Sequence, residues 1–173
     1  MTYALITLFV LVAGLCAYAT TRPDTFRLER STLIAAPPDR IIPLIADFRR
    51  WAAWSPFENI DPTMTRTYGG ADQGVGATYA WSGTGKAGAG RMEIIEQSPE
   101  RVAIKLDFSK PFEAHNIAEF TAVPDGAGTR VTWAMHGPSP FISKLMTVFF
   151  SIDRMVGKDF EAGLASMKQV AER

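Results

Sequence analysis

The sequence predicts an α+β fold in which a curved antiparallel sheet of about seven strands wraps around a long C-terminal helix, preceded by a transmembrane helix. Three observations predict it: an uncharged apolar run at the N-terminus, alternating segments separated by glycine- and proline-rich turns, and a final segment with helical periodicity. A sheet with one apolar face needs cover, and a long apolar helix supplies it. At 173 residues the chain is long enough for one such domain with a real core.

The charge balance and the cysteine content exclude several classes of protein. Eighteen basic residues offset eighteen acidic ones, so no net field draws the chain towards nucleic acid. The single cysteine, Cys16, lies inside the apolar run. The chain therefore has neither a disulfide framework nor a thiolate metal site.

The N-terminal run, residues 1–21, contains no charged side chain. About twenty helical residues are enough to cross the hydrocarbon core of a bilayer. A cleaved signal peptide is the alternative, because Ala17-Tyr18-Ala19 resembles a cleavage site, but no basic residue precedes the apolar core as a signal requires. Leu15 is too large for the position before a lipidated cysteine. The run is therefore predicted to be an uncleaved single-pass anchor.

A short linker, residues 22–25, separates this anchor from a globular domain predicted over residues 26–173. Arg22, Arg27 and Arg30 follow the anchor closely. An excess of basic residues next to a membrane span is typical of the cytoplasmic side. Counting them favours a cytoplasmic domain.

One strand and two short helices begin the domain. Residues 26–34 alternate between two faces, which predicts a half-buried strand. Pro38 and Asp39 then suit the first turn of a helix, whose apolar stripe runs from Ile41 to Phe48. A second short helix is predicted over residues 48–54. Two tryptophans, two phenylalanines and two prolines crowd residues 47–62, which we call the aromatic elbow.

Six further strands are predicted as an antiparallel meander. Turn residues at hairpin spacing separate them. Eight of the fourteen glycines lie between Gly69 and Gly90, which indicates bent and bulged strands. The predicted strands cover residues 64–68, 77–82, 90–97, 101–108, 115–123 and 128–136.

The C-terminal segment is predicted to be one long helix that starts near Pro140. Apolar residues recur every three or four positions from Leu145 to Met167. Gly157 costs about 1 kcal/mol relative to alanine within a helix. A kink or break is therefore expected within residues 151–157.

Short motifs along residues 26–172 resemble those of the START/Bet v 1-like (SRPBCC) superfamily, in particular the bacterial polyketide cyclase/dehydrase and lipid transport group. Their order and spacing carry the resemblance. The matching residues are Arg30-Ser31, Ile34, Ala36-Pro37-Pro38, Trp51-Ala52-Ala53-Trp54-Ser55-Pro56, Asp61-Pro62, Tyr79-Ala80-Trp81, Gly128-Thr129-Arg130-Val131-Thr132-Trp133 and Gly157-Lys158-Asp159-Phe160-Glu161-Ala162-Gly163-Leu164.

This resemblance implies a helix-grip fold with an apolar cavity between the sheet and the C-terminal helix. It places the anchor in a bacterial inner membrane. It does not imply one activity, because the superfamily includes lipid carriers, hormone binders, aromatase/cyclases, coenzyme Q-binding proteins and chaperone regulators.

The segment Gly83-Thr84-Gly85-Lys86-Ala87-Gly88 matches a dinucleotide-binding fingerprint. That fingerprint needs a helix after it, so that the phosphate meets a helix N-terminus. The residues that follow, Met92-Glu93-Ile94-Ile95, have the pattern of a strand. We interpret the segment as a hairpin turn and expect no nucleotide.

Catalytic and metal-binding groups are sparse. His115 and His136 lie on different predicted strands, and His115 shares an outer face with Glu113 and Glu119. Without further converging ligands we expect no metal and no other cofactor. The chain has no Gly-x-Ser-x-Gly elbow, so no catalytic nucleophile is visible and the catalytic residues are unknown.

The strand alternation assigns an inner, apolar face that lines the expected cavity. Asn116 lies on it with Ala118, Phe120 and Ala122; its amide either polarises a ligand carbonyl or bonds to neighbouring backbone. In the aromatic elbow we expect Trp51 to fill the core and Trp54 to act as a gate. The candidate ligand-binding residues are Trp54, Tyr79, Trp81, Met92, Leu106, Phe108, Asn116, Phe120, Trp133, Met135 and Phe160.

Three functions fit these observations. The preferred one is a membrane-tethered binding or transport domain for a hydrophobic small molecule such as a lipid, a quinone or a polyketide-like compound. The second is a cyclase or dehydratase that uses a cavity acid–base group. The third is a protein-interaction module of the chaperone-regulator type. The ligand and the oligomeric state do not follow from the sequence.

Overall fold

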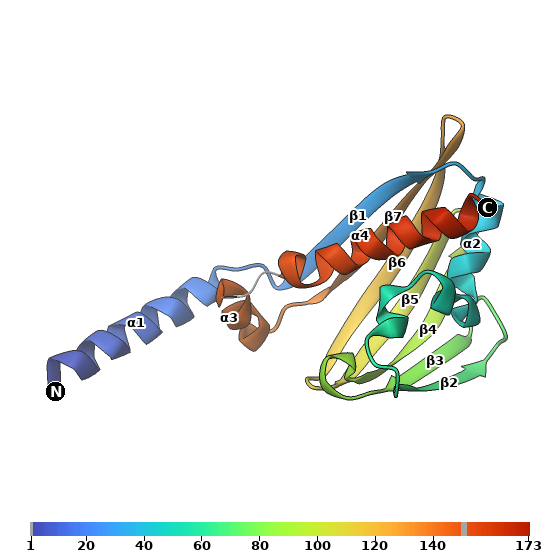
Figure 1. The fold of residues 1–173 in the computed structure, drawn as a ribbon. Helices are drawn as coiled ribbons and strands as arrows, with labels where there is room; N and C mark the ends of the chain where they lie inside the picture. The colour runs from blue at the N-terminus through green and yellow to red at the C-terminus, as the bar shows by residue number, and fades with distance from the viewer. Residues whose placement is uncertain (1, 150–151) are drawn as a thin grey trace.

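A seven-stranded antiparallel sheet forms the body of the protein, in the order β1-β7-β6-β5-β4-β3-β2 (Figure 1). The computed structural model describes residues 2–149 and 152–173. The strands are β1 (Thr25–Ile34), β2 (Thr65–Gly70), β3 (Ala77–Ser82), β4 (Ala89–Ser98), β5 (Arg101–Lys110), β6 (Ala114–Asp125) and β7 (Gly128–Pro138). All seven predicted strands are confirmed, and each differs from its predicted range by a few residues at most.

Helices precede the sheet, interrupt it after β1 and follow it. They are α1 (Thr2–Thr20), α2 (Pro38–Ala46), α3 (Phe141–Phe149) and α4 (Ile152–Ala171), with the 3₁₀ helices η1 (Phe48–Ala53), η2 (Pro56–Asn59) and η3 (Gly85–Ala87). Helix α4 lies across β1 and β7 on one face of the sheet (Figure 1). The predicted helix-grip arrangement of a curved sheet around a C-terminal helix is confirmed.

The C-terminal segment consists of two helices, divided at the N-terminal edge of the range 151–157 in which a kink or break was predicted. Helix α3 ends at Phe149 and α4 begins at Ile152, and residues 150–151 lie outside the described residues. Helix α4 continues through Gly157, where no break occurs. Gly157 instead makes room for Arg30, because a Cβ at this position would overlap the guanidinium group.

Ion pairs and hydrogen bonds hold α4 to β1 along its length. Arg30 on β1 donates to Asp153 and to Glu161, each at 2.7 Å. Near the other end, Lys168 donates to the carbonyl of Leu33 at 2.8 Å, and the backbone N–H of Ala35 donates to Glu172 at 2.6 Å. The sequence offered no signal for these pairs, because the partners are far apart along the chain.

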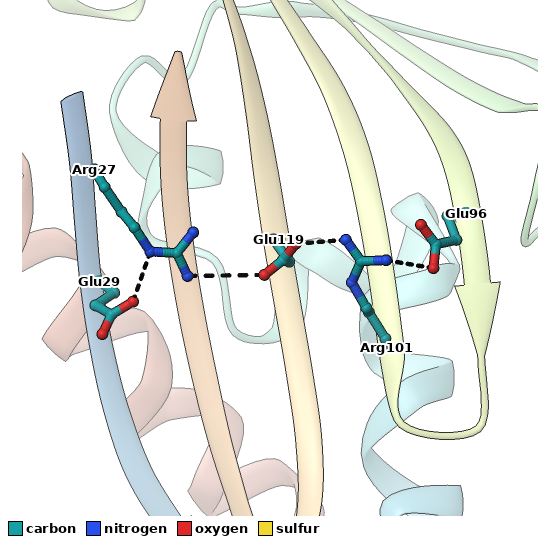
Figure 2. A network of polar contacts seen from close by, with 5 residues as sticks. All are labelled: Arg27, Glu29, Glu96, Arg101 and Glu119. Atoms are coloured by element: carbon teal, nitrogen blue, oxygen red, sulfur yellow. Dashed lines mark hydrogen bonds and ion pairs between the residues drawn. The ribbon is translucent and has the colours of Figure 1, made fainter. Parts of the chain in front are cut away.

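Charged residues cover the outer face of the sheet. Figure 2 shows a network in which Glu119 on β6 lies between Arg101 on β5 and Arg27 on β1. Arg101 also pairs with Glu96, and Arg27 pairs with Glu29 at 2.9 Å. The Arg101 guanidinium holds the pKa of Glu119 below its usual value. The outer face is therefore a hydrated, ion-paired surface.

The N-terminal run forms α1, which extends away from the sheet (Figure 1). Over the described residues, no helix combines the length and the hydropathy needed to cross a membrane. The transmembrane role predicted for residues 1–21 is not supported by the structure.

Candidate functional site

The concave face of the sheet brings together the residues predicted to line a ligand site. Alternation along the strands turns nine of these side chains inward, as the two-residue period of a strand requires, while Trp54 follows η1 and Phe160 lies on α4. Trp81 and Phe108 are half-buried, and the other nine are buried. The buried ones are Trp54, Tyr79, Met92, Leu106, Asn116, Phe120, Trp133, Met135 and Phe160.

Trp133 is the centre of an aromatic cluster that fills the middle of the grip. Its ring stacks on Phe160 of α4, with 4.0 Å between centroids, and on Phe120 of β6 at 5.0 Å. Trp54 and Phe57 meet it in T-shaped pairs, with 5.6 Å and 5.9 Å between ring centroids. Stacked and edge-to-face pairs at these distances are favourable. The centre of the expected apolar cavity is therefore occupied by side chains.

The aromatic elbow forms part of this core. The indole N–H of Trp51 donates to the carbonyl of Ile45, and that of Trp54 donates to the carbonyl of Leu44, both at 2.9 Å. Trp51 fills the core as expected. Trp54 is only 2% exposed, so the structure places it in the core as well, rather than at an opening where it could act as a gate.

Three half-buried apolar side chains, Phe26, Trp81 and Phe108, lie at one end of the sheet, together with the buried Asn116. We call this end the apolar end. The register places these side chains on different strands along this end: Phe26 pairs with Gly137, Asn116 with Leu106, and Trp81 with Gly90, which in turn pairs with Phe108. The rings of Trp81 and Phe108 meet edge to face at 5.6 Å. This end differs from the filled centre because its aromatic side chains keep exposed surface.

Two buried polar groups near the aromatic cluster lack hydrogen-bond partners among the described residues. They are the indole N–H of Trp133 and the hydroxyl of Ser55. None of the described hydrogen bonds involves the amide of Asn116, which lies against Gly137, where a Cβ would overlap its Oδ1. Because nearly all buried polar groups in proteins are paired, water or a ligand is expected to satisfy these groups.

A buried carboxylate, that of Glu58, lies beside Tyr79 and was not predicted from the sequence. The Tyr79 hydroxyl donates to Glu58 Oε1 at 2.7 Å, and Arg66 Nε donates to Glu58 Oε2 at 2.6 Å. Burial, and then this bond to Glu58, raises the pKa of Tyr79. Since the hydroxyl is already engaged, Tyr79 presents only its ring to the interior. Glu58 shows no periodicity with an apolar face, so alternation alone could not have revealed it.

Asp61 fixes the glycine-rich segment that follows β3. Its carboxylate accepts hydrogen bonds from the backbone N–H groups of Thr63 at 2.8 Å and Thr84 at 2.7 Å, and from both hydroxyls. These bonds hold the pKa of Asp61 well below its usual value. The segment forms η3 and leads into β4, which confirms the predicted strand after it. The indole N–H of Trp81 donates to Ala87 in this segment at 2.9 Å.

His115 lies on the outer face, as predicted. It is hydrogen-bonded to Asp107 at 2.7 Å, and this contact raises the pKa of His115 and lowers that of Asp107. Over the described residues, no group of three or more acidic, histidine or cysteine side chains could hold a metal ion.

Two open grooves are described on the surface. One, of about 420 Å³, lies between β1 and α4 and includes Arg30, Glu161 and Lys168. The other, of about 520 Å³, lies at the apolar end and includes Phe108, Asp107 and His115. Both are lined by charged side chains together with apolar surface, and the second reaches the edge of the apolar end.

Comparison with known proteins identifies the family. Residues 25–172 match the family described as polyketide cyclase / dehydrase and lipid transport. The chain belongs to this family. The predicted superfamily is thereby confirmed. No curated protein matches the sequence.

Solved structures with low sequence identity share the fold of this polyketide cyclase / dehydrase and lipid transport family member. Protein CV1439 from Chromobacterium violaceum is 18% identical, with a TM-score of 0.59, covering 88% of this chain and 99% of that one. The di-domain ARO/CYC StfQ from the steffimycin biosynthetic pathway is 10% identical, with a TM-score of 0.62, covering 86% of this chain and 51% of that one. The Aha1 dimer from Colwellia psychrerythraea is 14% identical, with a TM-score of 0.57, covering 85% and 96%.

Proposed function

We propose that this protein binds a hydrophobic small molecule at the apolar end, between α4 and the sheet. The observation that carries the proposal is the half-buried aromatic surface of Trp81 and Phe108, at the same end of the sheet as the inward-facing Asn116, whose amide takes part in none of the described hydrogen bonds. A buried donor that remains unpaired costs about 1–3 kcal/mol. A ligand oxygen that accepts from it recovers this cost.

Asn116 supplies the polar contact in the proposed site. It is 8% exposed and turned inward at the apolar end, on the strand next to Phe108, where it pairs with Leu106. Ligand sites of this kind combine an apolar lining with a few placed polar groups. An apolar compound with one or two carbonyl or hydroxyl oxygens suits the site, and lipids, quinones and polyketide-like compounds share this chemistry.

Binding is favoured over catalysis by the state of the ionisable groups. The buried candidates for acid–base work, Tyr79 and Glu58, are bonded to each other and to Arg66. The amide of Asn116 donates and accepts hydrogen bonds but does not take up a proton at ordinary pH. His115 and Asp107, which line the groove at the apolar end, lie on the outer face of the sheet, whereas a cyclase or dehydratase acting on an enclosed ligand would need a proton-transfer group on the inner face.

The test compares two substitutions that remove a buried polar group without changing its volume greatly. We expect Asn116→Leu to weaken binding of a quinone or fatty-acid probe by about 2–10-fold, which is the contribution of one hydrogen bond. The free energy of unfolding should not fall, because the amide has no hydrogen-bond partner among the residues that the structure describes. Native mass spectrometry and calorimetric titration of the full chain measure the affinity, and urea denaturation measures the stability.

Thr129→Val is the matched control. The Thr129 hydroxyl is buried and donates to the carbonyl of Ala36 at 2.6 Å. We expect this change to lower stability and leave the affinity unchanged. Failure of the native protein to bind any probe from a panel of lipids, quinones and aromatic polyketides would refute the proposed function.

A further inference from the structure

Helices α1 and α3 expose apolar side chains on the same side of the molecule. Helix α1 extends away from the sheet, and α3 packs against α1 near the point where the two helices join the domain (Figure 1). On α1, Tyr3 is 87% and Phe9 73% exposed; on α3, Ile142 is 68% exposed. A folded protein rarely leaves such a surface uncovered unless it is an interaction site.

Polar contacts attach α3 to the segment between α1 and β1. The carbonyl of Asp24, just before β1, accepts a hydrogen bond from the N–H of Ser139 at 2.6 Å. The Asp24 carboxylate pairs with the ammonium group of Lys144 on α3. Since Thr25 pairs with Pro138 in the sheet, the helices join the domain beside Phe26 and Gly137.

The boundary between this surface and the domain has the composition of a membrane–water interface. No charged side chain occurs in residues 1–21, and Arg22 is the first. The guanidinium of Arg22 lies over the ring of Tyr18, 5.2 Å from its centroid. Tyrosine and arginine at the end of an uncharged apolar segment are typical of the headgroup level of a bilayer.

We propose that the exposed apolar side chains of α1 and α3 insert into a lipid bilayer, which brings the apolar end of the sheet against the membrane. That this contact lets the apolar end exchange ligand with the membrane rests on the proposed function. The insertion itself does not rest on it. A bilayer can bury an apolar helix whichever side of the helix faces the lipid. Charged and polar side chains help a helix to select the register and orientation of a protein partner, and α1 has no charged ones.

The outer face of the sheet contrasts with this surface. Its side chains form the ion-paired network of Figure 2, and burying such charges in lipid is costly. The bilayer is therefore expected to contact the α1–α3 side of the protein and to leave the outer face in water.

Vesicle flotation of the full chain tests the insertion. We expect the protein to float with phosphatidylcholine vesicles, and Ile142→Glu to weaken this binding by at least about tenfold, because burial of one large apolar side chain is lost. Ile95→Glu is the matched control: Ile95 is 46% exposed on β4, outside α1 and α3, and its substitution should leave flotation unchanged.

Three results would overturn the insertion: a native protein that stays with the aqueous fraction, equal flotation of Ile142→Glu and native protein, or soluble oligomers whose formation prevents flotation. The last result would assign the surface to a second copy of the chain, and analytical ultracentrifugation without vesicles detects it. A protein that floats normally but takes up no quinone or fatty acid from the same vesicles would retain the insertion and refute the proposed function, so the two failures are distinguishable.

Discussion

Trp54 shows how burial changes the interpretation of a single residue. Its position in the aromatic elbow suggested a gate, yet its indole is hydrogen-bonded to Leu44 and packed against Trp51, Phe120 and Trp133. We expect Trp54→Ala to lower the free energy of unfolding by about 3–5 kcal/mol, because it opens a cavity in this cluster. Urea denaturation measures the loss, and a change in ligand exchange with unaltered stability would restore the gate.

The alternation of side chains along a strand, which turns Phe120 and Trp133 inward, also predicted the orientation of Asn116 and His115. Both lie on β6, one residue apart, and they face opposite sides of the sheet. The period of a strand requires this. It could not predict that the Asn116 amide lies against Gly137 or that Asp107 pairs with His115, because those contacts depend on neighbouring strands.

Gly163 sets how closely α4 approaches the sheet. A Cβ at this position would lie 2.8 Å from the Trp133 ring and 3.0 Å from Pro56. Although alanine favours a helix by about 1 kcal/mol over glycine, we expect Gly163→Ala to destabilise the protein by about 1–3 kcal/mol through overpacking. Thermal or urea unfolding measures the sign of the effect.

A double-mutant cycle with Trp133→Phe is the control for this prediction. The smaller ring relieves the contact, so the two changes should be less destabilising together than the sum of the single effects. Strict additivity would show that the ring does not limit the position of α4.

Gly157, the glycine on which the predicted helix break was based, illustrates a limit at the scale of elements. Gly157 marks a weak point when helix propensity alone is considered, yet α4 continues through it. The glycine is explained by a tertiary contact, since Arg30 crosses the helix there to reach Asp153 and Glu161. Propensity is a local quantity and does not report such approaches.

At the scale of the whole molecule, several carboxylates are held charged by the fold. The pKa values of Asp61, Asp107 and Glu119 are lowered by hydrogen bonds. A lowered folded-state pKa gives stability that is present above the unfolded value and is lost as the pH falls through the folded value. We therefore expect stability to decrease below about pH 4, and Asp61→Asn to flatten this acid limb in urea titrations at several pH values.

His115 affects the pH dependence of stability in the opposite direction. Its pKa is raised by Asp107, so its stabilising effect is complete below the unfolded value and is lost as the pH rises through the folded one. His115→Gln should reduce stability at acidic pH more than at alkaline pH. An unchanged profile would show that the exposed pair contributes nothing to stability.

The sequence by itself determined the elements of this protein and the direction in which most side chains face. Residue periods of two and of three to four are local properties, and they predicted the seven strands, the inner aromatic set and the C-terminal helix. Short motifs in order also predicted the family.

Only the tertiary structure decided which distant residues meet and how much of the interior they fill. Arg30 and Glu161 are 131 residues apart, and Thr129 and Ala36 are 93 apart. Periodicity assigns a side chain to a face, but the volume left between a helix and a sheet depends on the sum of all side chains that enter it. For this reason the ligand site is proposed at the apolar end, beside the stacked rings of Trp133 and Phe160 that occupy the predicted cavity.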